Sequence, residues 1–134
     1  MNQLSAVIKS IETEENISLV TVEAAGIYFS TLVIDTPATA TYLHIGNEVI
    51  MVFKETAMSI AKNITGSLSI RNRFPAIVTS VKHDKLLTAI ALDCKGLKLT
   101  AIITSRSAKE LDLKNNDIVE GLVKTNDISL MLKE

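Results

Sequence analysis

A repeat of 70 residues constrains the fold of this chain more than any other feature of its sequence. When the 134-residue sequence is shifted by 70 positions, it aligns with itself without a gap. Glycine, lysine and asparagine fall in register together with the aliphatic residues, so the match goes beyond a general likeness among strands. The identical pairs include Asn2/Asn72, Ala6/Ala76, Gly26/Gly96, Leu43/Leu113, Lys54/Lys124 and Ser59/Ser129. We therefore expect two related domains, residues 1–64 and 67–134, joined near residues 63–66.

Within each unit the apolar residues alternate or form short runs, which are the patterns of β-strands. Val, Ile and Thr make up 39 of the 134 residues, and this composition favours sheet. In the first unit we expect strands over residues 4–11, 18–23, 27–34 and 49–54, each with a counterpart in the second. The sequence predicts an all-β fold of two tandem OB-like five-stranded barrels, each with one short helix.

The short helices are predicted at equivalent places in the two units. In the second unit, Ser107 and Glu110 have the spacing of a capping box, with Ser107 as the N-cap. In the first unit, Thr36 is the expected N-cap and Pro37 the first helical residue.

Size and composition point to self-association. A β unit of about 65 residues buries too little surface to be stable alone. The chain is 47% hydrophobic and only 4% aromatic, so its aliphatic sheet faces need covering. We therefore expect a homo-oligomer built through the sheets.

Several classes of protein are excluded by the same composition. Apolar content is high and net charge is -1, which excludes a disordered chain. The sequence has no run of 18 apolar residues and no secretory leader, so we expect a cytoplasmic protein with no membrane partner. The single cysteine, Cys94, cannot form an internal disulfide or build a metal site alone.

Catalytic motifs are also missing from the sequence. It has no phosphate-binding glycine loop, no zinc-protease helix and no nucleophile elbow. The two histidines, His44 and His83, fall in predicted turns, where histidine is usually just solvated. We therefore expect a protein that is not an enzyme.

Charge divides the chain unequally and points to the second unit as an anion binder. Residues 1–65 carry three lysines and seven acids, whereas residues 66–134 carry eleven lysines and arginines and eight acids. Ser69 and Arg71 lie two residues apart on an extended segment, so they face the same side. Lys124 ends a predicted strand and is followed by Thr125. These hydroxyl and cationic groups suit a tetrahedral oxyanion.

The predicted helix start in the second unit adds a further group of donors. Thr104, Ser105 and Ser107 lie where free backbone amides and the positive end of the helix dipole face outward. The first unit keeps only Lys54 and Thr56. Its helix start has Asp35, which repels an anion, and Pro37, which has no N–H.

At these residues the sequence resembles the Mop domain of the molbindins, also called the TOBE domain. A typical unit opens with Ser-Ala-Arg-Asn, here Ser69-Ile70-Arg71-Asn72. Its middle is similar to Leu-Thr-Ala-Val-Ile-Thr-x-x-Ser, here residues 99–107. Its end is similar to Gly-x-x-Val-x-Ala-Leu-Ile-Lys-Ala-Ser-x-Val, here residues 46–58 and again 116–128. The resemblance covers nearly the whole chain.

The resemblance implies binding of molybdate or tungstate at interfaces between domains, for storage, buffering or homeostasis, with no organic cofactor and no directly ligated metal. It also implies an oligomer, with a trimer favoured and a dimer possible. Carried over by position, the oxyanion-binding candidates are Ser69, Ile70, Arg71, Asn72, Thr104, Ser105, Ser107, Lys124 and Thr125, with Lys54 and Thr56 as weaker candidates in the first domain.

Departures from the family pattern leave the number of sites and the anion preference open. Ala76 and Asn126 replace the family's Gly and Ser, and the first unit lacks the Ser-Ala-Arg start. Three other functions remain as alternatives: a regulatory effector module that reports oxyanion to a partner protein, a structural domain whose site has decayed, and an OB-fold nucleic-acid binder. The last needs aromatic stacking platforms and a basic groove, and five aromatics with a net charge of -1 argue against it.

Overall fold

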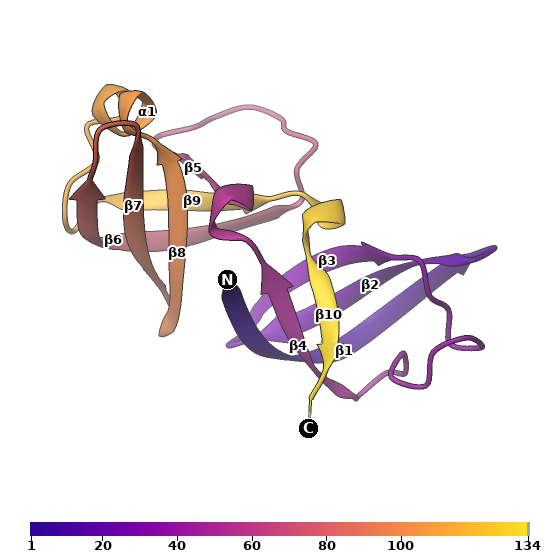
Figure 1. The fold of residues 1–134 in the computed structure, drawn as a ribbon. Helices are drawn as coiled ribbons and strands as arrows, with labels where there is room; N and C mark the ends of the chain where they lie inside the picture. The colour runs from indigo at the N-terminus through magenta and orange to yellow at the C-terminus, as the bar shows by residue number, and fades with distance from the viewer. Residues whose placement is uncertain (134) are drawn as a thin grey trace.

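Two curved five-stranded antiparallel sheets make up the structure, a computed structural model that describes residues 1–133 (Figure 1). The first half of the chain forms β1 (Asn2–Glu14), β2 (Ile17–Ala24), β3 (Ile27–Val33), β4 (Glu48–Phe53), the 3₁₀ turn η1 (Glu55–Ala57) and β5 (Ser59–Ala61). The second half forms β6 (Asn72–His83), β7 (Leu87–Cys94), β8 (Leu97–Thr104), α1 (Ser105–Glu110), β9 (Ile118–Val123), the 3₁₀ turn η2 (Thr125–Asp127) and β10 (Ser129–Leu132).

The 70-residue repeat is visible in the backbone itself. Each strand of the first half has its counterpart about 70 residues later, in the same order. Even the irregularities agree, because β1 shifts register against β2 between Ile8 and Ser10 and β6 shifts against β7 between Val78 and Ser80. The predicted all-β fold with two repeated five-stranded units is confirmed.

The two halves exchange their last strands. One sheet has the order β10-β4-β1-β2-β3, and the other has the order β5-β9-β6-β7-β8. Thus β10 of the second half pairs with β4, and β5 of the first half pairs with β9 (Figure 1). Each sheet is completed by the other half of the chain. The domain boundaries at residues 64 and 67 stay a prediction about the sequence, because neither sheet is built from one half alone.

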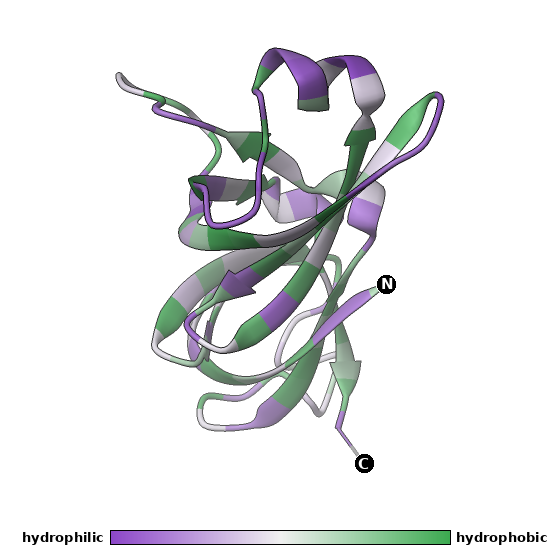
Figure 2. Cartoon of the chain, turned by 90° about the vertical axis from the view of Figure 1, so that its left-hand side faces the viewer, coloured by the Kyte–Doolittle hydropathy of each residue, from purple (hydrophilic) through white to green (hydrophobic). Residues whose placement is uncertain are grey.

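Alternation along the strands buries one side of each curved sheet. In β2, every second residue from Ser18 to Ala24 is buried, and Figure 2 shows apolar and polar positions interleaved along the strands. The buried side chains of both halves form one continuous cluster. Phe29 and Phe74 join the halves edge to face, with ring centroids 5.3 Å apart.

Two asparagines fasten the halves together in a symmetric way. The Asn2 amide donates to the Thr100 carbonyl at 2.9 Å and accepts from the Thr100 N–H at 2.8 Å. The Asn72 amide accepts from the Ser30 N–H at 2.7 Å and donates to the Ser30 carbonyl at 2.8 Å. Both asparagine side chains are buried. Each forms two hydrogen bonds with the backbone of one strand residue in the opposite half.

The predicted helices need two corrections. In the second half α1 is present, but Thr104 is its N-cap, since the Thr104 hydroxyl accepts from the Ser107 N–H at 3.1 Å. The assignment of Ser107 as N-cap was wrong by one turn.

In the first half, residues 36–42 form turns and no helix. The Thr36 carbonyl accepts from the amides of Thr39 and Ala40, which is a single turn. The Thr39 hydroxyl bonds to both the N–H and the carbonyl of Thr36 and competes with further helical bonds.

No helix in residues 1–133 is long and apolar enough to cross a membrane. The same residues contain no cluster of three or more His, Cys, Asp or Glu side chains that could hold a metal ion.

Candidate oxyanion site

Arg71 and Lys124 come together at one end of the β6–β9 ladder. Asn72 is the first residue of β6 and pairs with Val123, the last residue of β9. Arg71 directly precedes Asn72, and Lys124 directly follows Val123, so the two cations flank the same pair of residues. Both cations therefore lie one residue beyond the paired part of the two strands. The sequence separates Arg71 and Lys124 by 53 positions, and the sheet makes them neighbours.

Both cations are exposed and unengaged. Among residues 1–133, neither Arg71 nor Lys124 forms an ion pair, although seven other cationic groups do. The Arg71 and Ile70 side chains line a hollow of about 380 Å³ together with residues 66–68 and Arg73. Exposed Ser69 lies just before this pair, and half-buried Thr125 follows Lys124. A guanidinium, an ammonium and two hydroxyls therefore gather at one end of the second sheet.

Arg73 differs from Arg71 although it lies only two residues away. Its Nε and Nη2 atoms both lie 3.0 Å from the carboxylate of Glu120, a two-point contact. This contact raises the pKa of Arg73 and lowers the pKa of Glu120. Arg73 is thus held by its own chain, whereas Arg71 remains available to a ligand.

Two predicted ligands are committed to the fold instead. The side-chain amide of Asn72 uses both its N–H donor and its carbonyl acceptor in hydrogen bonds with Ser30, as described above. Buried Ser105 donates to the Asp84 carbonyl at 2.7 Å, and its hydroxyl lies 2.9 Å from that of Thr88. The side chains of Asn72 and Ser105 therefore position other parts of the protein.

Thr104 and Ser107 lie away from Arg71 within one chain. Thr104 pairs with Leu87 at the start of β7, beyond the far end of β6. Along the chain, the 12 residues of β6 lie between this end and Arg71. The Thr104 hydroxyl donates to the Ser107 hydroxyl at 2.9 Å. One chain therefore holds the predicted site residues in two separate groups.

The first half carries an acid at the equivalent of the Arg71 and Lys124 site. Lys54 follows β4 as Lys124 follows β9, and Met1 stands where Arg71 stands in the second half. The Met1 amine, however, lies 2.9 Å from the Glu55 carboxylate and lowers its pKa. Glu55 occupies the position of Thr125, so a carboxylate replaces a hydroxyl beside Lys54.

Asp127 adds a second acid near Lys54. It lines the same hollow of about 360 Å³ as Lys54. Thr56 is exposed and adjoins Glu55. Sequence reasoning attributed the weakness of the first site to Asp35 and Pro37 and missed Glu55, which the repeat alignment of Glu55 with Thr125 could have revealed.

Other polar side chains have structural partners. His44 Nδ1 lies 3.0 Å from the Thr41 carbonyl, and His83 Nδ1 lies 3.3 Å from the Thr88 hydroxyl. Burial raises the pKa of the Cys94 thiol, which favours its neutral form. Burial and a hydrogen bond to Asp35 raise the pKa of Tyr42 to about 12.

Together, the exchanged sheets and the cationic corner define a class: a two-unit β protein with a site suited to a small anion. Residues 68–130 match the family model of the TOBE domain. These residues form a TOBE domain, as the resemblance to that family predicted.

Curated proteins with a similar sequence are molybdenum import proteins. Over 68 residues the chain is 40% identical to the molybdenum import ATP-binding protein ModC of Brucella abortus and of Brucella suis. The match covers 50% of this chain and 19% of ModC. The chain therefore spans about a fifth of the length of the curated relatives it matches.

Solved structures extend the likeness of fold to the whole chain. The cytoplasmic molybdate-binding protein ModG, in a form with molybdate bound, superimposes with a TM-score of 0.93 at 20% identity, covering 98% of this chain and 96% of that one. A molybdate-binding protein from Sporomusa ovata is 37% identical and covers 44% of this chain and 88% of its own, with a TM-score of 0.43.

Proposed function

We propose that this chain binds a tetrahedral oxyanion, molybdate or tungstate, at the corner formed by Arg71 and Lys124. The observation that carries the proposal is that these two exposed cations flank the terminal pair of one ladder, with no acid of residues 1–133 bonded to either. Ser69, Thr125 and the backbone near Ile70 supply further donors. A guanidinium fork binds two oxygens of an oxyanion at once, and an ammonium can bind a third.

Molybdate is the favoured anion because of the relatives. ModG and the Sporomusa ovata protein are molybdate-binding proteins, and ModC is a molybdenum import protein. The role we propose is storage, buffering or homeostasis of the anion in the cytoplasm, without catalysis. A regulatory effector module would use the same site and differ only in its partner protein. The three phenylalanines are buried, so they offer no stacking surface to nucleic acid.

Self-association belongs to the same proposal. Many large aliphatic side chains are exposed in the single chain, among them Ile34, Ile45, Leu86 and Ile118. A homo-oligomer would cover them, with a trimer favoured and a dimer possible. Thr104 and Ser107 would then contribute to anion binding only through a contact between copies.

Substitution of the two cations tests the site. We expect Arg71→Ala and Lys124→Ala each to weaken molybdate binding roughly 10- to 100-fold in titration calorimetry, because each removes a charge-assisted contact. Lys54→Ala is the matched control, since it removes the equivalent lysine beside Glu55, and we expect it to change the affinity much less. Unchanged affinity in both Arg71→Ala and Lys124→Ala would refute this placement of the site.

A further inference from the structure

A buried hydroxyl of the first half contacts the turn that carries Lys124. Thr31 belongs to β3, and its side chain is fully buried. Its hydroxyl donates to the carbonyl of Ile128 at 2.5 Å, a contact between residues 97 positions apart. Ile128 directly follows η2, whose first residue is Thr125. Because a buried hydroxyl and a buried carbonyl are costly without partners, this bond fixes the end of η2 against β3.

The segment that carries Arg71 is held at the same place. Asn72, which follows Arg71, forms its two side-chain hydrogen bonds with the backbone of Ser30. Ser30 and Thr31 are consecutive residues of β3. The two segments that carry the cations are therefore both bonded to one short stretch of a strand in the first half.

The equivalent turn of the first half is held differently. β8 lies against η1 as β3 lies against η2, and Thr31 corresponds to Ala101, which is buried but has no hydroxyl. Met58, the residue after η1, instead closes its own turn, since its N–H donates to the Glu55 carbonyl at 3.4 Å. Within residues 1–133, the N–H of Ile128 has no such bond inside η2. The hydroxyl of Thr31 therefore holds the one turn of the two that does not close itself in this way.

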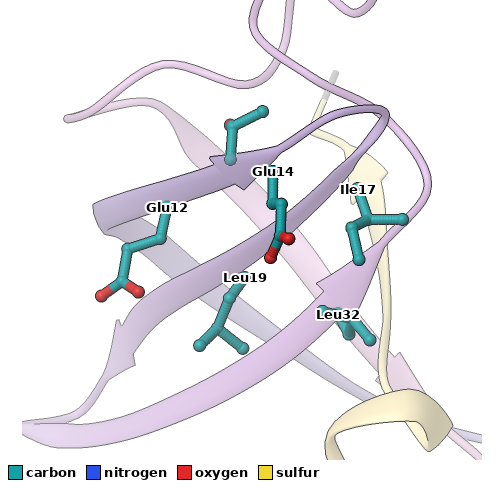
Figure 3. Close-up of a pocket in the computed structure, with 6 residues that line it drawn as sticks. Glu12, Glu14, Ile17, Leu19 and Leu32 are labelled. Carbon is teal, nitrogen blue, oxygen red and sulfur yellow. The ribbon is translucent and has the colours of Figure 1, made fainter.

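The outer side of β3 takes no part in this contact. Leu32, the next residue, points the other way, because successive side chains of a strand alternate. It is 43% exposed and lines a hollow of about 290 Å³ together with Leu19 and Glu14 (Figure 3). A substitution of Leu32 therefore alters β3 and leaves the hydroxyl of Thr31 in place.

We propose that Thr31 is a positioning residue for oxyanion binding, which acts through η2 and does not touch the anion. Its hydroxyl fixes the end of the turn, and the turn sets where the ammonium of Lys124 and the hydroxyl of Thr125 lie relative to Arg71. The ladders fix β9 before this turn and β10 after it, so the bond acts on the residues between them. Charge-assisted hydrogen bonds weaken when their geometry is disturbed. The inference rests on the proposed function, because it concerns the same site.

Removal of the hydroxyl tests this role in the full chain. Thr31→Val keeps the shape of the side chain, and Thr31→Ala copies Ala101 of the second half. We expect each to weaken molybdate binding roughly 3- to 10-fold in titration calorimetry, the effect of losing one buried hydrogen bond. Thr31→Ser keeps the hydroxyl and should keep the native affinity.

Coupling to Lys124 separates positioning from a general loss of stability. In a chain with Lys124→Ala, we expect Thr31→Val to change the affinity little further, because the cation that it positions is gone. In a chain with Arg71→Ala, the effect of Thr31→Val should persist. Both pairs are measured by the same titration at raised protein concentration.

Two further variants are the controls. Ser18→Ala removes another buried hydroxyl, which donates to the backbone carbonyl of Asp35 at 2.7 Å, and Leu32→Ala alters the outer side of β3. Both should keep the native affinity, although Ser18→Ala should lower the midpoint of thermal unfolding as Thr31→Ala does. Far-ultraviolet circular dichroism confirms that each variant is folded at the temperature of the titration.

The results that overturn this inference differ from those that refute the proposed site. The inference is overturned if Arg71→Ala and Lys124→Ala weaken binding while Thr31→Val and Thr31→Ala do not. It is also overturned if Thr31→Ser or Ser18→Ala loses as much affinity as Thr31→Val, or if Lys124→Ala leaves the effect of Thr31→Val unchanged. If the native chain does not bind molybdate, the proposed function and this inference are both refuted.

Discussion

At the scale of single residues, two neighbours at the start of β6 have different roles. The Asn72 side chain stabilises the fold, and the Arg71 side chain is available to bind a ligand. Asn72 and Arg71 are adjacent, yet Asn72 is buried against Ser30 while Arg71 is exposed and forms no ion pair within residues 1–133. Asn2 repeats the role of Asn72 in the other half through Thr100. The agreement of Asn2 with Asn72 in the repeat thus reflects a structural requirement of the junction between halves.

Removal of the Asn72 amide should destabilise the whole chain. We expect Asn72→Ala to lower the free energy of unfolding by on the order of 2–4 kcal/mol, because the N–H and carbonyl of Ser30 lose their buried partner together. Asn2→Ala should have a similar effect through Thr100. Chemical denaturation measures both, and a loss below about 0.5 kcal/mol, typical of a plain surface substitution, would contradict this role.

Gly121 is required by close packing and not by its backbone conformation. A Cβ at this position would lie 2.5 Å from Cε2 of Phe74 and 3.3 Å from Sδ of Met58. The equivalent residues of the first half are Met51 and Leu4, so a larger side chain there faces a smaller one.

Gly121→Ala should therefore overpack the core and cost about 1–3 kcal/mol of unfolding free energy. Adding Phe74→Leu, which copies Leu4 of the first half, should recover part of this loss. Thermal denaturation of the two variants makes the comparison, and a Gly121→Ala protein as stable as the native chain would count against the close contact.

At the scale of elements, alternation predicted the strands well, but pairing of the last strands could not be predicted. Strands β4 and β9 occupy equivalent positions in the repeat, so the sequence does not distinguish which of them β10 joins. The choice is made by η1 and η2, which follow β4 and β9 directly and lead the chain across to the other half. Lys62 strengthens one crossing, since its ammonium donates to the Leu111 and Asp112 carbonyls and to Asp117.

The short helix shows a similar limit of sequence reasoning. Thr104 and Ser107 are both hydroxyl residues, and either could cap a helix whose length is only six residues. The extra hydrogen bonds of Thr39 in the first half depend on turn geometry that no sequence pattern specifies.

A designed disulfide can test the exchange of strands directly. Met131 of β10 lies opposite Ile50 of β4, whereas the equivalent of Ile50 in the second half is Glu120. We expect Ile50→Cys with Met131→Cys to form a cross-link within one chain on mild oxidation, because residues opposite each other in a ladder have suitable spacing.

The matched control is Glu120→Cys with Met131→Cys, which should remain reduced. Non-reducing electrophoresis and peptide mass mapping distinguish the two results. If instead the Glu120 variant forms the cross-link, β10 belongs to its own half and the exchanged topology is wrong.

At the scale of the whole molecule, the uneven charge of the two halves can be predicted from the sequence, whereas the grouping of the cations cannot. The excess of cations in residues 66–134 includes both Arg71 and Lys124, and the sheet brings these two together. The same excess includes Lys85, Arg106 and Lys109, which surround a hollow beyond the other end of β6. Total charge per half could not separate the two groups, since their separation depends on the direction of β6.

A net charge near zero conceals the difference between the two halves of this chain. The net charge of -1 combines an acidic half and a basic half with the same fold. The two halves share one fold but differ in their surface residues. At one equivalent position, for example, the first half has Glu55 and the second half has Thr125.

Titration calorimetry of the native chain with molybdate, with sulfate and phosphate as competitors, tests the central claim most directly. Our account predicts heat of binding at micromolar protein, with a stoichiometry set by the second half of the chain alone because Glu55 lies beside Lys54 in the first. Absence of binding heat with molybdate, or equal occupation of both halves, would contradict it.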